Sequence, residues 1–327
     1  MIVYRTYTRR LFAVVAVVAV LAGAVPALAQ HPATWRFPAP DAAAAWFQAL
    51  DDAHLAGPGA FAFYRSPGTP DSPLARTLSA ARGYEILHFA PLYYPSASRD
   101  ALVRAARDAT APSGTPRAPR AAFLVGALAA ALPAAALRAP LAPLADAVER
   151  SRPRIVPAEA IERWQLAWNT RFAGALAPFL HAERLDGGVV MVAAALGPEG
   201  RLFAGRPDDR ADNIVAVGTS DGAPSPDAPV FALVRELCFP MVSRAAEQSP
   251  ALKVATAEAA RRASVAAVRC GADLLDRFIP AEAGGYRSHW RHAAGAAGDD
   301  DFDSLFPPDP ILAPRLRTAL GRFSPRP

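Results

Sequence analysis

The side chains best suited to chemistry lie together on one predicted helix, residues 230–246. Arg235 and Phe239 are four positions apart, so a helix places one above the other, with Glu236 beside them. A carboxylate acts as a general base when it lies within hydrogen-bond reach of the water or group that it deprotonates. Glu236 could act in this way only where the fold places such a group within its reach.

A second group of polar side chains follows further along the chain. His289 and His292 are three positions apart, and an acidic run comes after them, with Asp299, Asp300, Asp301 and Asp303. Imidazole and carboxylate groups bind divalent cations, so the two histidines are weak candidates for a metal site. Their spacing matches no specific ligand pattern, and we expect a solvated acidic loop after a helix end.

Two further signals have simple structural explanations. Gly218–Gly222 matches G-x-S-x-G after a strand, but a nucleophile elbow requires a helix directly afterwards. Prolines at positions 224, 226 and 229 forbid that helix and indicate a turn. His88 lies in an aromatic-rich segment and is expected to be a hydrogen-bonded core residue. The chain has no glycine-rich phosphate loop, and we expect no cofactor.

The predicted helix at 230–246 carries an apolar stripe that must face a core. The stripe has helical spacing and consists of Val230, Leu233, Val234, Leu237, Cys238, Met241 and Val242. Two apolar segments precede the helix, at 187–196 and 213–218, and both read as buried strands. A turn is expected at 197–201, and Asp227 is the expected N-cap of the helix.

Further elements are expected on either side of this unit. Helices are predicted at 158–168, continuing to 180, and at 256–278. The N-terminal side reads as two helices with short strands between them: a helix from Asp41, strands at 61–64 and 84–94, and a helix at 98–109. Residues 110–120 read as a surface linker, and the Ala-rich segment 121–137 as a buried helical pair.

The order of elements in the C-terminal half resembles that of the zincin metallopeptidases. Two strands, a loop and a helix follow one another, and R-E-L-C-F at Arg235–Phe239 stands where those enzymes have H-E-x-x-H. The resemblance spans roughly Trp164 to Trp290 and implies that Glu236 occupies the position of the general base, which makes it the best catalytic candidate in this chain. Arginine and phenylalanine cannot bind zinc, so it implies a degenerate relative without metal.

The two cysteines offer a physical account of how such a site is held together. Cys238 and Cys270 are the two cysteines of the chain and are expected to form a disulfide, worth ~3–4 kcal/mol; two separate buried thiols are the alternative. If the bond joins two antiparallel helices, Arg235 lies near Asp273 and pairs with it in place of the metal. The alternative is that these two charges are solvated separately.

The N-terminus reads as a cleavable signal peptide covering residues 1–29. Arg5, Arg9 and Arg10 precede a 15-residue apolar run, and Ala27 to Ala29 supply small residues for cleavage. An uncleaved anchor is the alternative, although the run is shorter than the ~20 residues that span a bilayer. We therefore expect a periplasmic or extracellular protein with no stable membrane span after cleavage.

Composition limits the classes of function. Hydrophobic residues make up 52% and charged residues 20% of the 327 residues, which is typical of a globular protein. Cleavage after residue 29 lowers the formal net charge from +5 to +2, so a nucleic-acid surface is not indicated.

We expect an α+β protein, mainly helical with a small sheet. A mostly helical part covers 30–152 and a zincin-like part covers 153–327. The expected function is non-catalytic: the cleft with Arg235, Glu236, Phe239 and Asp273 binds a peptide or a cell-envelope partner along its edge strand. The alternative is a hydrolase that uses Glu236 with a histidine supplied by the fold, His181 or His289.

Overall fold

A computed structural model describes the folded part of the chain in segments. They are residues 34–39, 41–54, 61, 64–66, 74–76, 87–88, 90–93, 98–109, 140–203, 213–219, 225–252, 257–296 and 301–323. The expected signal peptide, the linker at 110–120, the Ala-rich segment at 121–137 and most of Gly218–Gly222 lie outside the described residues.

A four-stranded mixed sheet forms the centre of the molecule. Its strands are β1 (Trp35–Arg36), β2 (Gly188–Val192), β3 (Arg201–Phe203) and β4 (Ile214–Val217), in the order β1-β2-β4-β3. β1, β2 and β4 are parallel, whereas β3 pairs antiparallel with β4 at the edge. The two predicted strands are confirmed as β2 and β4, and they lie side by side.

Both faces of the sheet are buried, and its side chains alternate between two cores. Val190 and Val192 of β2, with Val215 and Val217 of β4, enter one core. The residues between them enter the other core: Met191, Ala193, Ile214 and Ala216. This alternation follows from the period of two along a strand, and it explains why both strands read as continuous apolar runs.

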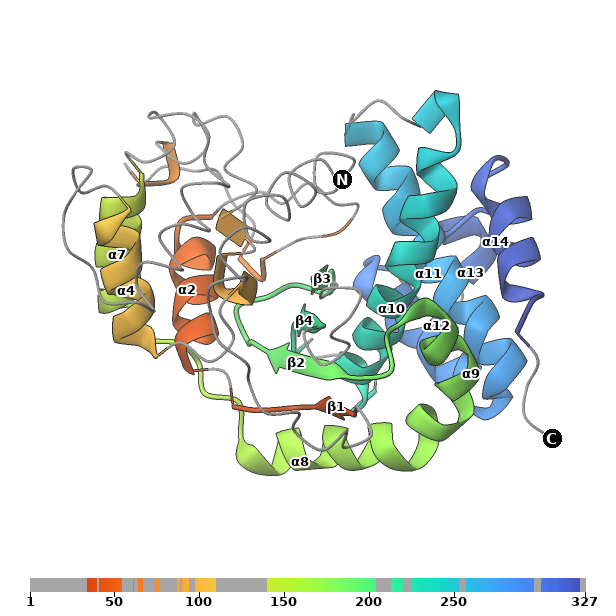
Figure 1. The fold of residues 1–327 in the computed structure, drawn as a ribbon, viewed down its shortest axis with the longest axis horizontal. Helices are drawn as coiled ribbons and strands as arrows, with labels where there is room; N and C mark the ends of the chain where they lie inside the picture. The colour runs from red at the N-terminus through yellow and green to blue at the C-terminus, as the bar shows by residue number, and fades with distance from the viewer. Residues whose placement is uncertain are drawn as a thin grey trace, which may run out of the picture.

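Three helices from the N-terminal side cover one face of the sheet (Figure 1). They are α2 (Asp41–Asp52), α4 (Arg99–Asp108) and α7 (Leu141–Arg150). Ser98 caps α4 by accepting from the backbone N–H of Ala101 at 3.2 Å. The helices predicted from Asp41 and at 98–109 are confirmed. The core beneath these helices also contains residues of β2 and β4, so the N-terminal and C-terminal parts of the chain share it.

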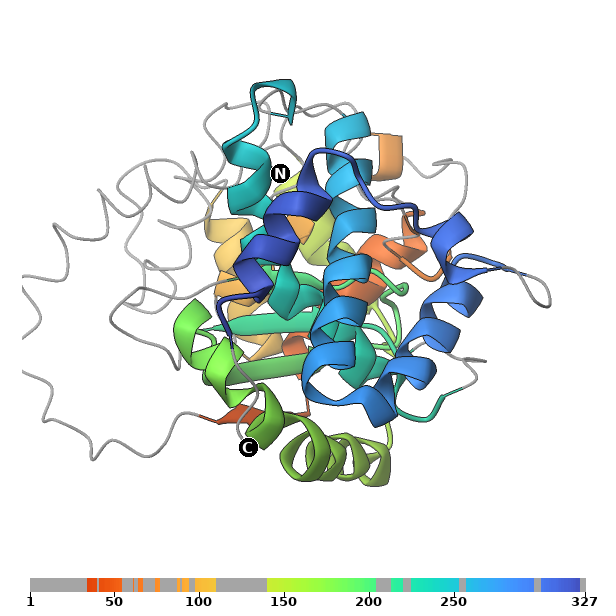
Figure 2. The same cartoon turned by 90° about the vertical axis from the view of Figure 1, so that its right-hand side faces the viewer.

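The C-terminal helices pack against the other face (Figure 2). They are α8 (Ala158–Ala167), η3 (Trp168–Phe172), α9 (Ala173–Glu183), α10 (Ala228–Glu247), α11 (Ala257–Phe278), α12 (Pro280–Ala293), α13 (Phe302–Leu305) and α14 (Leu312–Leu320). The helices predicted at 158–168, 230–246 and 256–278 are confirmed. The fold is therefore mainly helical with a small mixed sheet, as expected. None of the described helices has both the length and the apolar character needed to cross a bilayer.

Two local predictions are wrong. The described part of the segment predicted as a strand at 84–94 instead contains η2, a 3-10 turn at Ala90–Tyr93, because Pro91 lacks the N–H that a sheet ladder needs. Asp227 stands at the N-cap of α10 without capping it, since its carboxylate pairs with Arg171 at 2.6 Å. Pro240 lies inside α10, which continues to Glu247 while packed against α11 and α14.

Candidate functional site

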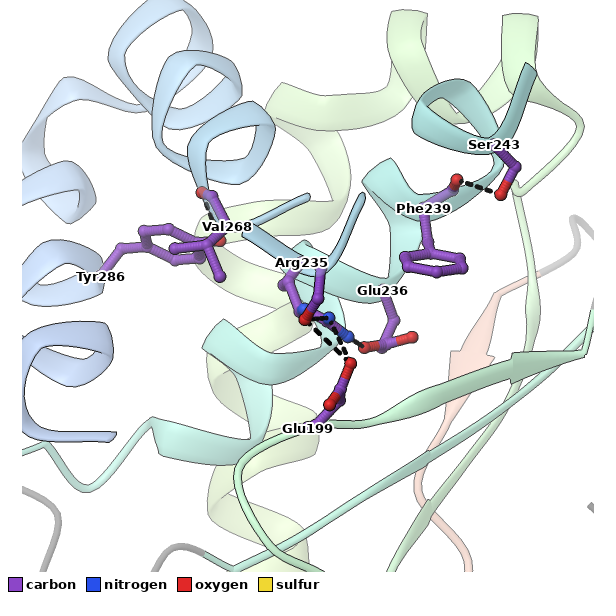
Figure 3. Close-up of polar contacts among 8 residues, drawn as sticks. Glu199, Arg235, Glu236, Phe239, Ser243, Val268 and Tyr286 are labelled. Carbon is purple, nitrogen blue, oxygen red and sulfur yellow. Dashed lines mark hydrogen bonds and ion pairs between the residues drawn. The ribbon is translucent and has the colours of Figure 1, made fainter. Parts of the chain in front are cut away.

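Arg235 and Glu236 project from α10 into the protein interior, where each residue is about 1% exposed. The sequence placed them on an open cleft face, and that expectation is wrong. The Arg235 guanidinium donates to the Glu236 carboxylate, and Glu199 lies against the same guanidinium (Figure 3). α10 therefore carries a buried ion pair at the position of Glu236, the best catalytic candidate of the sequence analysis.

Two further residues complete this cluster, and the sequence analysis missed both. Arg235 Nη2 donates to Glu199 Oε1 at 2.8 Å and to Ser264 Oγ at 2.6 Å. Ser264 Oγ in turn donates to Glu199 Oε1 at 2.9 Å. Glu199 comes from the turn between β2 and β3, and Ser264 comes from α11. We call Glu199, Arg235, Glu236 and Ser264 the ion cluster.

The charges of the ion cluster shift one another's ionisation. Burial opposes the charge of Arg235, but the carboxylates of Glu236 and Glu199 outweigh it and raise the pKa of Arg235. Burial also raises the pKa of Glu236 above its ordinary value, although Arg235 opposes this rise. The nearby charge of Arg201 acts in the same direction as Arg235. Arg201 is thus a second cation whose charge acts on Glu236.

Aromatic rings close the remaining sides of the Arg235 guanidinium. Its central carbon lies 5.4 Å from the centroid of the Phe239 ring and 5.8 Å from that of Trp290. The stacking of Phe239 over Arg235, one helical turn apart, follows the predicted spacing. Cation–π contacts of this kind stabilise a desolvated guanidinium. The cation is thus enclosed by two carboxylates, a hydroxyl and two rings.

Asp273 does not belong to this cluster, and the predicted ion pair between Arg235 and Asp273 is wrong. The α11 residue that reaches Arg235 is Ser264, six positions before Cys270, whereas the prediction required a residue one turn after Cys270. Asp273 faces the charges of Arg269, Arg287 and Arg317, and burial raises its pKa. Glu199 and Glu236 supply the carboxylates that Asp273 was expected to supply.

Cys238 and Cys270 lie next to each other in the core between α10 and α11. Both are buried free thiols in the structure, and they share a hydrogen bond. Burial raises the pKa of the Cys238 thiol. The expected disulfide remains a prediction, but the two side chains it requires are adjacent.

A thiol titration tests the disulfide directly. Protein exported to an oxidising compartment and unfolded in guanidinium is expected to react with no equivalent of Ellman's reagent before reduction and with two after it. Protein made in a reducing cytosol serves as the control and is expected to give two in both cases. Two reactive thiols in the exported protein would show that the pair stays reduced.

The histidines do not assemble a metal site in the described part of the chain. His289 is fully buried against Phe231 and Trp290, whereas His292 on the same helix is exposed. No group of three histidine, cysteine or acidic side chains that could hold a metal occurs among the described residues. Asp299 and Asp300 of the acidic run lie outside them.

The other two histidines singled out from the sequence, His88 and His181, lie in different surroundings, one buried and one exposed. His88 is buried and its Nδ1 is hydrogen-bonded to the hydroxyl of Tyr64, as expected for a core histidine. His181 is 75% exposed near the end of α9, with its Nδ1 3.7 Å from Asp186 Oδ1. Neither is a buried partner of the Glu236 carboxylate, whose hydrogen-bond donor is Arg235.

Comparison with known proteins indicates no family for this chain. A scan of family models, a search of curated proteins and a search of solved structures find no match to this chain. The zincin resemblance therefore rests on the order of the elements and on R-E-L-C-F at Arg235–Phe239. Function has to be argued from the ion cluster and from the sheet edge beside it.

Proposed function

We propose that the protein is an exported, non-catalytic pseudo-metallopeptidase that binds an extended peptide or an envelope partner. The observation that carries the proposal is Arg235, a fully buried cation at the first ligand position of the zincin-like motif. Its guanidinium is held by Glu199, Glu236 and Ser264. A fixed positive charge thus stands in a pocket of carboxylates, where a working relative would hold its metal.

The surroundings of Glu236 support the loss of catalysis. A general base must reach the water or group that it deprotonates, and the Glu236 side chain is 2% exposed and bonded to Arg235. The hydrolase alternative needs a histidine beside it. His181 is largely exposed on α9, and His289 is packed among aromatic rings on α12. Glu236 is better explained as the counter-charge of Arg235.

The edge of the sheet supports the binding part of the proposal. β3 is antiparallel and lies at the end of the strand order, and no strand of the described residues pairs with its outer side. β3 also packs against α10, the helix that carries the ion cluster. A strand edge without a strand partner offers backbone donors and acceptors to an extended peptide. Such binding requires no catalytic group.

Incubation of the mature protein with a peptide mixture tests both parts of this proposal. Analysis of the peptides reports cleavage, and hydrogen exchange of the protein reports binding at β3. The mature protein, incubated with extended peptides, is expected to leave every peptide intact, with or without added zinc. Binding peptides are expected to slow exchange of the backbone amides of Arg201–Phe203. A matched measurement on α4, on the opposite face of the sheet, should show no change. Peptide cleavage would contradict the loss of catalysis, and unchanged exchange at β3 would contradict edge binding.

A further inference from the structure

A groove lies between the ends of three C-terminal helices, apart from the ion cluster. α10 contributes one face at helical spacing, with Met241, Arg244, Ala245 and Gln248. α14 and the residues after it contribute a second face, which includes Arg315, Leu316, Ala319, Arg322 and Phe323. Ala182 and Glu183 of α9 also line it. The volume is about 590 Å³, within the range of small-molecule sites.

The groove has an apolar floor and a positively charged rim. Met241, Ala245 and Leu316 line it and are largely buried beneath it. Three guanidinium groups also line it, those of Arg244, Arg315 and Arg322, against the single carboxylate of Glu183. The lining therefore carries two more positive than negative charges. These charges surround an apolar floor.

The three arginines differ in how far their hydrogen-bond donors are already used. Arg244 pairs with Glu183. Arg315 donates from Nη1 to the carbonyl of Ala245 at 2.8 Å, which fixes the guanidinium at the rim. Its other nitrogens make no hydrogen bond with the residues that the structure describes. Arg322 is exposed, and its guanidinium has no ion pair with the residues that the structure describes. Two guanidinium groups thus have donors to offer.

We propose that this groove binds an organic monoanion with an apolar body, in which a carboxylate meets Arg315 and Arg322 and an alkyl or aryl chain covers Met241 and Leu316. Arginine forks match the two oxygens of a carboxylate. The apolar chain of the ligand gains free energy by leaving water. An uncharged molecule with the same chain lacks the contacts with the arginines of the rim. The proposal does not depend on the ion cluster or on peptide binding at β3.

Calorimetric titration of the mature protein with decanoate tests the proposal. We expect one decanoate per chain, and about tenfold weaker binding of decanol, which has the same chain without the charge. The variant Arg322→Met should weaken decanoate binding about tenfold. Arg317→Met, which changes an exposed arginine of α14 outside the lining, is the matched control and should bind as the wild type does.

A second variant keeps the test independent of charge. Ala319→Phe places a ring in the groove and should abolish decanoate binding while the thermal midpoint stays near that of the wild type. Absence of decanoate binding at about 1 mM would overturn the proposal. Binding that survives both Arg322→Met and Ala319→Phe would also overturn it. So would Arg322-dependent binding to phosphatidylglycerol vesicles without binding of free decanoate, because the site would then be a membrane surface contact.

Discussion

The variant Arg235→Met is expected to unfold with a free energy about 3–5 kcal/mol lower than that of the wild type. Methionine fills much of the same volume but leaves Glu199 and Glu236 buried without their cation. An uncompensated buried charge is among the most destabilising changes that a single substitution makes. Urea unfolding followed by circular dichroism at neutral pH measures the difference.

Two comparisons separate this effect from lost packing. Arg261→Met removes an arginine whose pair with Glu258 is exposed on α11, and it should change the free energy of unfolding by less than about 0.5 kcal/mol. Adding Glu199→Gln and Glu236→Gln to Arg235→Met removes the uncompensated charges and should recover much of the loss. If Arg235→Met were as stable as the wild type, the ion cluster would not hold the site together.

Acidification is expected to produce the second large effect, through His289. Burial, together with the nearby His292, lowers the pKa of His289 from 6.5 to about 4. Between these two pH values the unfolded chain binds a proton at this residue and the folded chain does not. Stability from His289 is therefore complete above pH 6.5, falls as the pH drops toward 4, and levels off below that. The expected loss is about 3 kcal/mol.

Urea unfolding at a series of pH values checks this prediction. His289→Phe removes the proton-binding group, and its stability should fall less between pH 6.5 and 4 than that of the wild type. His181→Gln changes an exposed histidine and should retain the wild-type pH dependence. His88, whose pKa is also lowered by burial and by Arg201, contributes a separate loss that both variants keep. Equal slopes for the wild type and His289→Phe would contradict a buried neutral His289.

Periodicity predicted the elements whose patterns are long and regular. The apolar stripe along α10 and the apolar runs of β2 and β4 indicate from the sequence alone that these elements are buried. β1 and β3 are two and three residues long, too short to show a period. α12 contains Gly284 and Gly285 and a polar last turn, so its sequence shows only a weak apolar pattern. Its burial comes from packing against α10 and α11.

The candidate site shows the same division between local and distant information. The stacking of Arg235 and Phe239 follows from their separation of four residues on one helix. Glu199 and Ser264 reach Arg235 from 36 and 29 residues away, and no local pattern indicates them. The charged residues of α10 read as solvent-facing because polarity usually marks the surface. Only the packing of other elements over them makes that reading wrong.

The metal content of the mature protein tests the central claim most directly. Protein purified from an oxidising compartment and dialysed without chelator should contain far less than one zinc per chain, because the buried guanidinium of Arg235 repels a divalent cation from Glu199 and Glu236. Elemental analysis by mass spectrometry, with protein concentration from amino-acid analysis, gives the ratio. Near-stoichiometric zinc that survives dialysis would contradict the account and would mean that this chain holds a metal after all.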